Sequence, residues 1–163
     1  MARMVIVRAI LLSVLLVSPG LAGEFSGSVV GVLDGDTIEV LHAHQTDRIR
    51  LSGIDCPEKG QAYGQRAKQA TSARIFGKEV TLRAFGKDRY GRTIADVILP
   101  DGGNLNQLLV KEGMCWWYRK YAPGNAVLEA LETDAREKRM GLWAEAQPIP
   151  PWEWRKAKRP SRP

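Results

Sequence analysis

The sequence predicts an α+β fold that is mainly β, in which five strands form a small barrel and helices pack on it. Short apolar runs that alternate with period two are separated by turn residues, which is typical of antiparallel strands. Three other stretches carry apolar residues at helical spacing. The length of 163 residues and a charged fraction of 26% fit one globular domain and exclude collagen-like, disordered and disulfide-dense chains.

The first three strands are predicted over residues 25–33, 37–41 and 48–51. Asp34 and Gly35 stand between the first two runs and form a strong hairpin-turn signal. In the third strand Ile49 and Leu51 point to one side, so Arg50 faces the other side if the apolar pair enters the core.

Gly53 predicts a bend after the third strand that would aim residues 55–58. The remaining strands are predicted at 80–85 and 93–99, and the helices at 65–76, 105–112 and 125–140. Asn125 is a good N-cap for the last helix, and glycines end all three helices.

Residues 1–22 have the pattern of a secretory signal peptide, with two arginines, an apolar run at 9–17 and small residues before a cleavage site. The alternative, an uncleaved membrane anchor, is disfavoured because the run is short for a bilayer. We therefore expect a secreted or periplasmic chain from about residue 23, with no membrane span after signal cleavage.

The positive charge is concentrated at the ends of the chain. The formal net charge is +6, and the body between 23 and 151 has equal numbers of acidic and basic residues. Residues 148–163 are Pro-rich, and 155–163 carry five basic side chains, so we expect a mobile basic tail. The tail either holds nucleic acid or is a solvated terminus, and Trp152 and Trp154 either pack on the body or form a partner site.

Several short motifs follow one another along residues 26–144: DGDTIEV, RIRLSGIDCPE, YGQRA, DRYGR, LNQLLVKEG and GLW. Each is weak alone, but in this order and among these strands they resemble the staphylococcal nuclease (thermonuclease) family. The resemblance implies a five-stranded OB-fold barrel with three packed helices, here over residues 23–147. OB-folds commonly bind single-stranded nucleic acids.

The resemblance also implies roles for individual residues. Asp36 and Asp55 match the family's calcium-binding carboxylates, and the backbone carbonyl of Cys56 stands where the family offers a threonine carbonyl to the metal. Glu58 matches the catalytic glutamate. The two catalytic arginines correspond to Arg50 and Arg92.

This set of residue types suits phosphodiester hydrolysis on chemical grounds. Hard divalent cations select carboxylate and carbonyl oxygens, arginine binds phosphate oxygens through two N–H groups, and a carboxylate can orient or deprotonate water. The resemblance thus implies a monomeric, Ca²⁺-dependent endonuclease that hydrolyses DNA and/or RNA with relaxed specificity. The alternatives are an inactive OB-fold module that only binds nucleic acid, and a protein whose tail binds anionic surface polymers.

The aromatic segment 116–121 corresponds to a wall of the family's nucleotide pocket. Tyr121 keeps one of the two family tyrosines, and Arg119 replaces the other. We expect Arg119, Tyr121 and Tyr90 to contact substrate, and Trp117 to be packed in the core.

The two cysteines allow two interpretations. An exported chain with two cysteines favours a disulfide, and in the resembled fold the segment that Cys115 begins lies beside the loop of Cys56. The resembled nuclease, however, folds without a disulfide, and cysteines also pack well as free thiols in cores. A Cys56–Cys115 bridge therefore stays one of two possibilities at this point.

Overall fold

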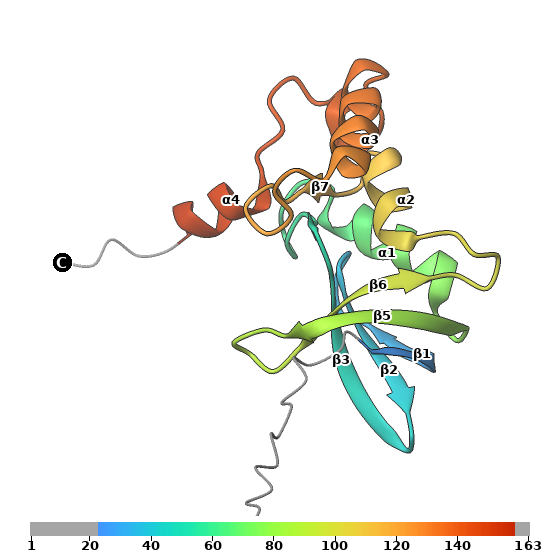
Figure 1. Ribbon diagram of the computed structural model, residues 1–163. Helices are drawn as coiled ribbons and strands as arrows, with labels where there is room; N and C mark the ends of the chain where they lie inside the picture. Colours follow the sequence, from blue (N-terminus) through green and yellow to red (C-terminus); the bar gives the residue numbers. More distant parts are fainter. Residues whose placement is uncertain (1–22, 159–163) are drawn as a thin grey trace, which may run out of the picture.

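The computed structural model describes residues 23–158 and confirms the predicted barrel (Figure 1). Five strands close it: β1 (Glu24–Val32), β2 (Thr37–His42), β3 (Gln45–Leu51), β5 (Glu79–Lys87) and β6 (Thr93–Ile98). The strand order is β1-β2-β3-β6-β5, and only the β3–β6 pair is parallel. The signal peptide predicted over residues 1–22 lies outside the described residues.

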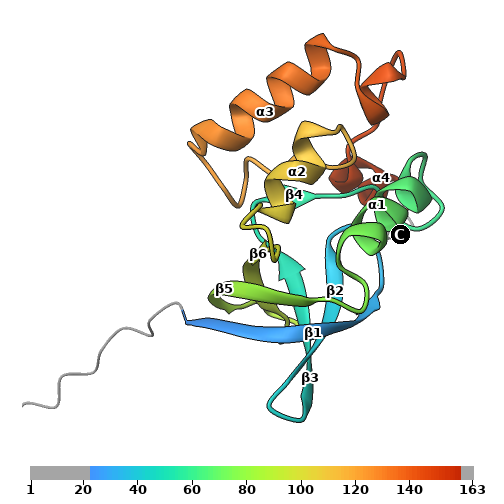
Figure 2. The ribbon, with the colours of Figure 1, turned by 90° about the vertical axis from the view of Figure 1, so that its right-hand side faces the viewer.

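The helices gather at one end of the barrel (Figure 2). They are α1 (Gly64–Ile75), α2 (Leu105–Lys111), α3 (Ala126–Glu137), α4 (Pro151–Ala157) and a 3₁₀ turn, η1 (Gly141–Ala144). Asn104 and Asn125 cap α2 and α3 by accepting hydrogen bonds from the backbone N–H groups of Gln107 and Leu128. In the described part of the chain, no helix combines the length and the apolar character needed to cross a bilayer.

The main core fills the barrel with alternate strand residues. Val40, Ile49, Leu51 and Leu82 are essentially inaccessible, as the period-two pattern predicts. A second apolar cluster lies outside the barrel, where Trp116 packs edge-on against both Trp143 and Trp152. This second cluster joins the C-terminal segment to the body of the protein.

A two-stranded sheet that the sequence pattern does not predict links the barrel to the helical layer. It pairs β4 (Ile54–Asp55) with β7 (Trp116–Trp117), and a disulfide joins Cys56 to Cys115 beside it. Strands of two residues carry too little alternation to be recognised from sequence.

The prediction of a mobile tail is wrong for the part of the C-terminal segment that the structure describes. Residues 151–157 form α4, a fourth α-helix, instead of extending from the body. Two prolines precede the segment, and Pro151 at the first helical position supplies a φ angle already suited to a helix. The basic residues from 159 onward lie outside the described residues.

Candidate active site

Asp36 and Arg50 meet where strand β2 begins and strand β3 ends. The Leu51 N–H donates to the Asp36 backbone oxygen at 2.9 Å, so the β2–β3 ladder holds both residues in register. As predicted from the alternation, Ile49 and Leu51 are buried in the barrel and Arg50 projects from the opposite face of β3. Arg50 Nη1 lies 2.7 Å from Asp36 Oδ2.

The predicted bend at Gly53 brings the next acidic residue to the same place. Gly53 has a φ of +68°, a conformation that favours glycine, and β4 follows at once. Asp55 Oδ1 then lies 2.9 Å from Arg50 Nη2. The Cys56 N–H donates to Asp36 Oδ2 at 2.6 Å, which places the Cys56 backbone beside the Asp36 carboxylate.

The two aspartates form a buried negative site. Asp36 is 5% exposed and Asp55 only 1%. Burial raises the pKa of Asp36 from 3.8 to about 7; the Arg50 charge opposes the rise, and the Asp34 and Asp55 carboxylates add to it. A raised pKa means that burial disfavours the ionised form of Asp36 more strongly than the neighbouring Arg50 charge favours it.

This donor set fits a hard cation such as Ca²⁺. Asp36 and Asp55 supply carboxylate oxygens, and the Cys56 carbonyl would supply a neutral oxygen of the kind calcium accepts. Within residues 23–158 no cluster of three or more His, Cys, Asp or Glu side chains is arranged for a metal. A calcium ion here would therefore need backbone, water or substrate oxygens to complete its shell.

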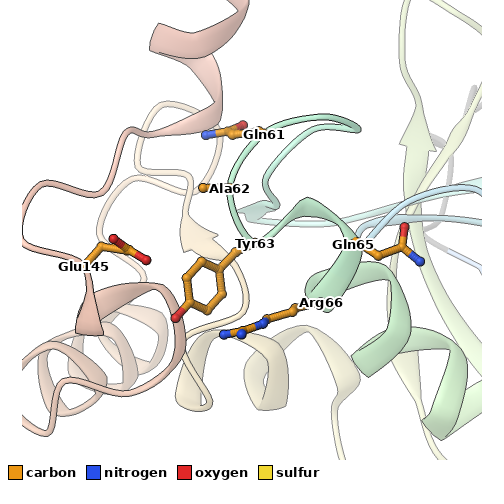
Figure 3. A pocket seen from close by; sticks show the side chains of 6 residues that line it. All are labelled: Gln61, Ala62, Tyr63, Gln65, Arg66 and Glu145. Atoms are coloured by element: carbon orange, nitrogen blue, oxygen red, sulfur yellow. The ribbon is translucent and has the colours of Figure 1, made fainter.

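Glu58 lies three residues beyond Asp55, on the loop that leads to α1. Its backbone N–H donates to Gln61 Oε1 at 2.9 Å, and Gln61 Nε2 donates to the Ile149 carbonyl at 2.7 Å. Gln61 therefore ties the Glu58 loop to the C-terminal segment. Gln61 also lines a pocket of about 340 Å³. Figure 3 shows the six residues that line this pocket, and none of them is a predicted site residue.

Arg155, which lies in the segment predicted to be a mobile tail, completes the cluster. Arg155 on α4 donates to Asp55 through Nη2 to Oδ2 at 2.7 Å and through Nη1 to Oδ1 at 3.1 Å. The same Nη1 lies 2.5 Å from Glu58 Oε1. These bonds, first to Asp55 and then to Glu58, raise the pKa of the Arg155 guanidinium despite its partial burial.

The sequence did contain a signal for Arg155. Pro150-Pro151 marks a helix start, and Trp152 and Arg155 then stand three residues apart on one helical face. An aromatic residue and a cation that share a face indicate a helix docked on the body rather than a free basic arm.

Arg92, the other predicted catalytic arginine, is positioned by its own turn. It lies between β5 and β6, and its Nε donates to Asp88 Oδ2 at 2.7 Å. Although desolvation opposes it, the hydrogen bonds from Arg92 and from the Tyr90 and Arg92 N–H groups lower the pKa of Asp88. The structure gives Arg92 no bond to Asp36, Asp55 or Glu58 within the described chain. Tyr90 is 68% exposed beside it.

The aromatic segment after β7 forms a basic pocket with α4. The pocket measures about 380 Å³ and is lined by Tyr118, Arg119, Lys120 and Trp152. Trp152 stacks on Tyr118 with ring centroids 5.2 Å apart. Of these four residues, Arg119 is the one that the sequence predicts to contact substrate, and Trp152 packs on the body, which is one of its two predicted alternatives.

The other predicted substrate-contacting residues occupy different environments. Arg119 lies over the Trp117 ring and pairs with Glu132 at 2.9 Å, while Trp117 itself is buried as expected. Tyr121 is 68% exposed and contacts Tyr118 edge-on. Arg119 thus lines the pocket, Tyr121 lies next to it against Tyr118, and Tyr90 lies on the turn that carries Arg92.

Comparisons with known proteins point to one family. The family model described as "Staphylococcal nuclease homologue" matches residues 48–145. The chain is 46% identical to an uncharacterized endonuclease of Escherichia coli O157:H7 over 140 residues, which is 86% of this chain and 91% of the relative. It is 45% identical to a micrococcal nuclease of Shigella flexneri, with 88% of each chain covered. A staphylococcal-like nuclease of Arabidopsis thaliana is 42% identical over 69% of this chain and 34% of its own length.

Proposed function

The chain belongs to the staphylococcal nuclease family, and from that premise we propose that it is an exported, calcium-dependent endonuclease that hydrolyses phosphodiester bonds of DNA and/or RNA with relaxed specificity. The alignments with the Escherichia coli and Shigella flexneri relatives cover most of this chain and most of each relative. Together with the family match, they support a hydrolase that acts on nucleic acid. The single observation that carries the finer proposal is the buried pair Asp36 and Asp55, joined by Arg50 and adjacent to the Cys56 backbone.

The proposed reaction adds water across a P–O ester bond. The water oxygen bonds to phosphorus, the bond to the leaving ester oxygen breaks, and the leaving oxygen gains a proton. Calcium, when bound by Asp36, Asp55 and the Cys56 carbonyl, supplies positive charge beside the phosphate oxygens. Glu58 accepts or directs the proton of the attacking water from its position beside Asp55.

Arg50 and Arg92 bind the phosphate oxygens in this proposal. Each guanidinium has five N–H donors, and the carboxylate bonds of Arg50 and Arg92 use only some of them. Donors that remain free can strengthen their hold on the oxygens as negative charge grows in the transition state. The exposed aromatic side chains of Tyr121 and Tyr90 suit contact with bases of any sequence.

Export is supported by the disulfide and the predicted signal peptide. Disulfides form and persist in oxidising compartments such as the periplasm or the extracellular medium, and Cys56 and Cys115 are bridged. Fractionation of cells that express the full chain tests this part. We expect activity in the periplasm or medium, and activity confined to the cytoplasm would contradict export.

One assay tests the chemistry. Purified protein is incubated with single- and double-stranded DNA and RNA in calcium, in magnesium and in a calcium chelator. We expect cleavage in calcium, little in magnesium and none in the chelator, and Glu58→Gln should lower turnover about 100-fold or more while the protein stays folded. Equal cleavage in magnesium would overturn the calcium assignment. Binding without cleavage under all conditions would favour an inactive OB-fold module.

A further inference from the structure

The C-terminal helix α4 delivers a guanidinium to the two acidic residues of the Glu58 loop. Arg155 follows Asp55 by 100 residues in the chain, yet it makes two hydrogen bonds to that carboxylate. Residue 155 also lies beyond the segment 48–145 that the family model matches.

Arg155 sets the position of the Glu58 carboxylate. Within residues 23–158, the Glu58 side chain makes no other hydrogen bond or ion pair. Its backbone N–H and C=O are both bound to Gln61, and these bonds hold the loop but not the carboxylate. A glutamate side chain has several rotatable bonds, so without a partner its carboxylate would sample many positions.

One nitrogen of Arg155 bridges two like charges. Nη1 lies 3.1 Å from Asp55 Oδ1 and 2.5 Å from Glu58 Oε1. Two neighbouring carboxylates repel each other, and a shared N–H donor offsets that repulsion and fixes their separation. Asp55 accepts three N–H contacts in all. A carboxylate has about four lone-pair sites, so room remains for a cation.

The helix that carries Arg155 is anchored independently of it. Trp152 stacks on Tyr118 and packs edge-on against Trp116, at 5.2 and 5.6 Å between ring centroids. The Ile149 carbonyl accepts from Gln61, and Pro151 is buried. These contacts fix α4 next to β7, where Figure 1 shows it. Because α4 is held rigidly, it can keep Arg155 in one position, and a catalytic group can be oriented only by a residue that is itself fixed.

We propose that Arg155 is a positioning residue of the nuclease reaction, which holds the Glu58 carboxylate in its working place beside Asp55. The inference rests on the proposed function, since Glu58 is there the group that handles the proton of the attacking water. In the described part of the chain, the Arg155 guanidinium bonds to the two carboxylates and also interacts with the Tyr118 hydroxyl. Its loss should therefore slow the chemical step more than it weakens substrate binding.

The test compares Arg155→Ala and Arg155→Lys with Lys156→Ala, an exposed neighbour on the same helix. For Arg155→Ala we expect kcat to fall about 10- to 100-fold, the usual range for loss of a residue that orients a functional group, with KM changed much less. Arg155→Lys keeps the positive charge but not the planar fork of the guanidinium, so its kcat should lie between those of Arg155→Ala and the wild type. Lys156→Ala should match the wild type.

Added guanidinium ion, well below denaturing concentration, provides a readout that a merely structural role would not produce. It should restore part of the kcat of Arg155→Ala and leave Lys156→Ala unchanged. Tryptophan fluorescence reports whether α4 stays docked, because Trp152 lies in the aromatic cluster.

Three results would overturn the inference. Wild-type kcat in Arg155→Ala would show that Glu58 needs no partner. A higher kcat would mean that Arg155 blocks the site, and a rise in KM alone would make it a substrate-binding residue. The experiment distinguishes failure of this inference from failure of the proposed function. A wild-type protein that is inactive in calcium would contradict both. An active wild type with an equally active Arg155→Ala variant would contradict only the role of Arg155.

Discussion

Arg50 Nη1 lies 2.7 Å from Asp36 Oδ2, so a guanidinium from β3 neutralises part of a carboxylate that is buried where β2 begins. Arg50 reaches Asp55 with its other terminal nitrogen. A single arginine thus holds both proposed calcium ligands. Even so, the pKa of Asp36 is raised to about 7 by burial in the metal-free protein.

The raised pKa predicts how stability depends on pH. Because the folded metal-free protein binds the Asp36 proton more tightly than the unfolded chain, the contribution of Asp36 to the free energy of unfolding is complete below about pH 4 and is lost as the pH rises to about 7. Urea denaturation in chelator should show this decline in the wild type but not in Asp36→Asn. Parallel pH profiles for the two proteins would contradict it.

The same ionisation predicts proton-linked calcium binding. Calcium requires the ionised carboxylate, so the apparent calcium affinity should fall roughly tenfold per pH unit below about pH 7. Titration calorimetry with calcium at several pH values measures it. A calcium affinity that stays constant between pH 5 and 8 would mean that Asp36 is not a ligand or is already ionised.

The two predicted catalytic arginines should differ in their effect on stability. Arg50→Ala removes the ion-pair partner of the buried Asp36 and one of the two arginines that bind Asp55, so it should cost about 3 kcal/mol or more in chelator, part of which calcium restores. Arg92→Ala removes a partly exposed pair with Asp88 and should cost about 1 kcal/mol or less. Both variants should lose turnover about 100-fold or more.

Urea denaturation and steady-state cleavage measure these effects. Arg83→Ala serves as the control, because Arg83 forms an exposed pair with Glu24 on the barrel. Turnover near that of the wild type in Arg92→Ala would remove Arg92 from the catalytic set. If Arg92→Ala lost as much stability as Arg50→Ala, the turn that carries Arg92 would be more important to the fold than its contacts indicate.

The disulfide should stabilise both the fold and the segment that carries Asp55 and Cys56. Cys56 and Cys115 are separated by 59 residues, and closing a loop of that size in the unfolded chain is worth roughly 4 kcal/mol by the chain-entropy estimate. The Cys56→Ser/Cys115→Ser variant should lose stability of that order. It should also bind calcium more weakly, because Cys56 follows Asp55 directly.

Thiol titration and urea denaturation test this expectation. The native oxidised protein should show no free thiol, and added reductant should destabilise the wild type but not the double serine variant. Two titratable thiols in the oxidised native protein would refute the bridge.

Truncations should separate the two parts of the C-terminal segment. Deletion of 159–163 removes two basic residues; it should change turnover little and reduce the salt dependence of substrate binding by at most about two units of slope. Truncation before Pro151 also removes Arg155 and should lower turnover. Equal turnover for both truncated proteins would show that α4 has no part in the reaction.

The barrel strands could be predicted because their signal is local. Alternation at Ile49 and Leu51 identified the core face of β3 and, with it, the outward direction of Arg50. The bend at Gly53 was equally local, since a positive φ is readily adopted by glycine. Candidate site residues in these segments followed from motifs whose spacing is written in the chain.

The position of the C-terminal segment could not be predicted, because it depends on residues far away in the chain. Five basic residues and two prolines in nine positions describe a solvated arm by composition alone. The negative charge that Arg155 meets comes from Asp55 and Glu58, about 100 residues earlier. Composition of a segment contains no information about the charge of the surface on which it lands.

The sequence by itself determined the barrel, its helices, the family motifs and the residue types available for phosphodiester chemistry, because strand alternation, helix caps and turn glycines act between near neighbours. Only the tertiary structure decided that Cys56 and Cys115 are bridged, that Trp152 stacks on Tyr118 and that Arg155 joins the acidic residues. Each of these contacts joins segments far apart in the chain. Their free energy depends on distance, burial and opposing charge in space, and these quantities exist only once the chain has closed into the barrel and its helices have docked.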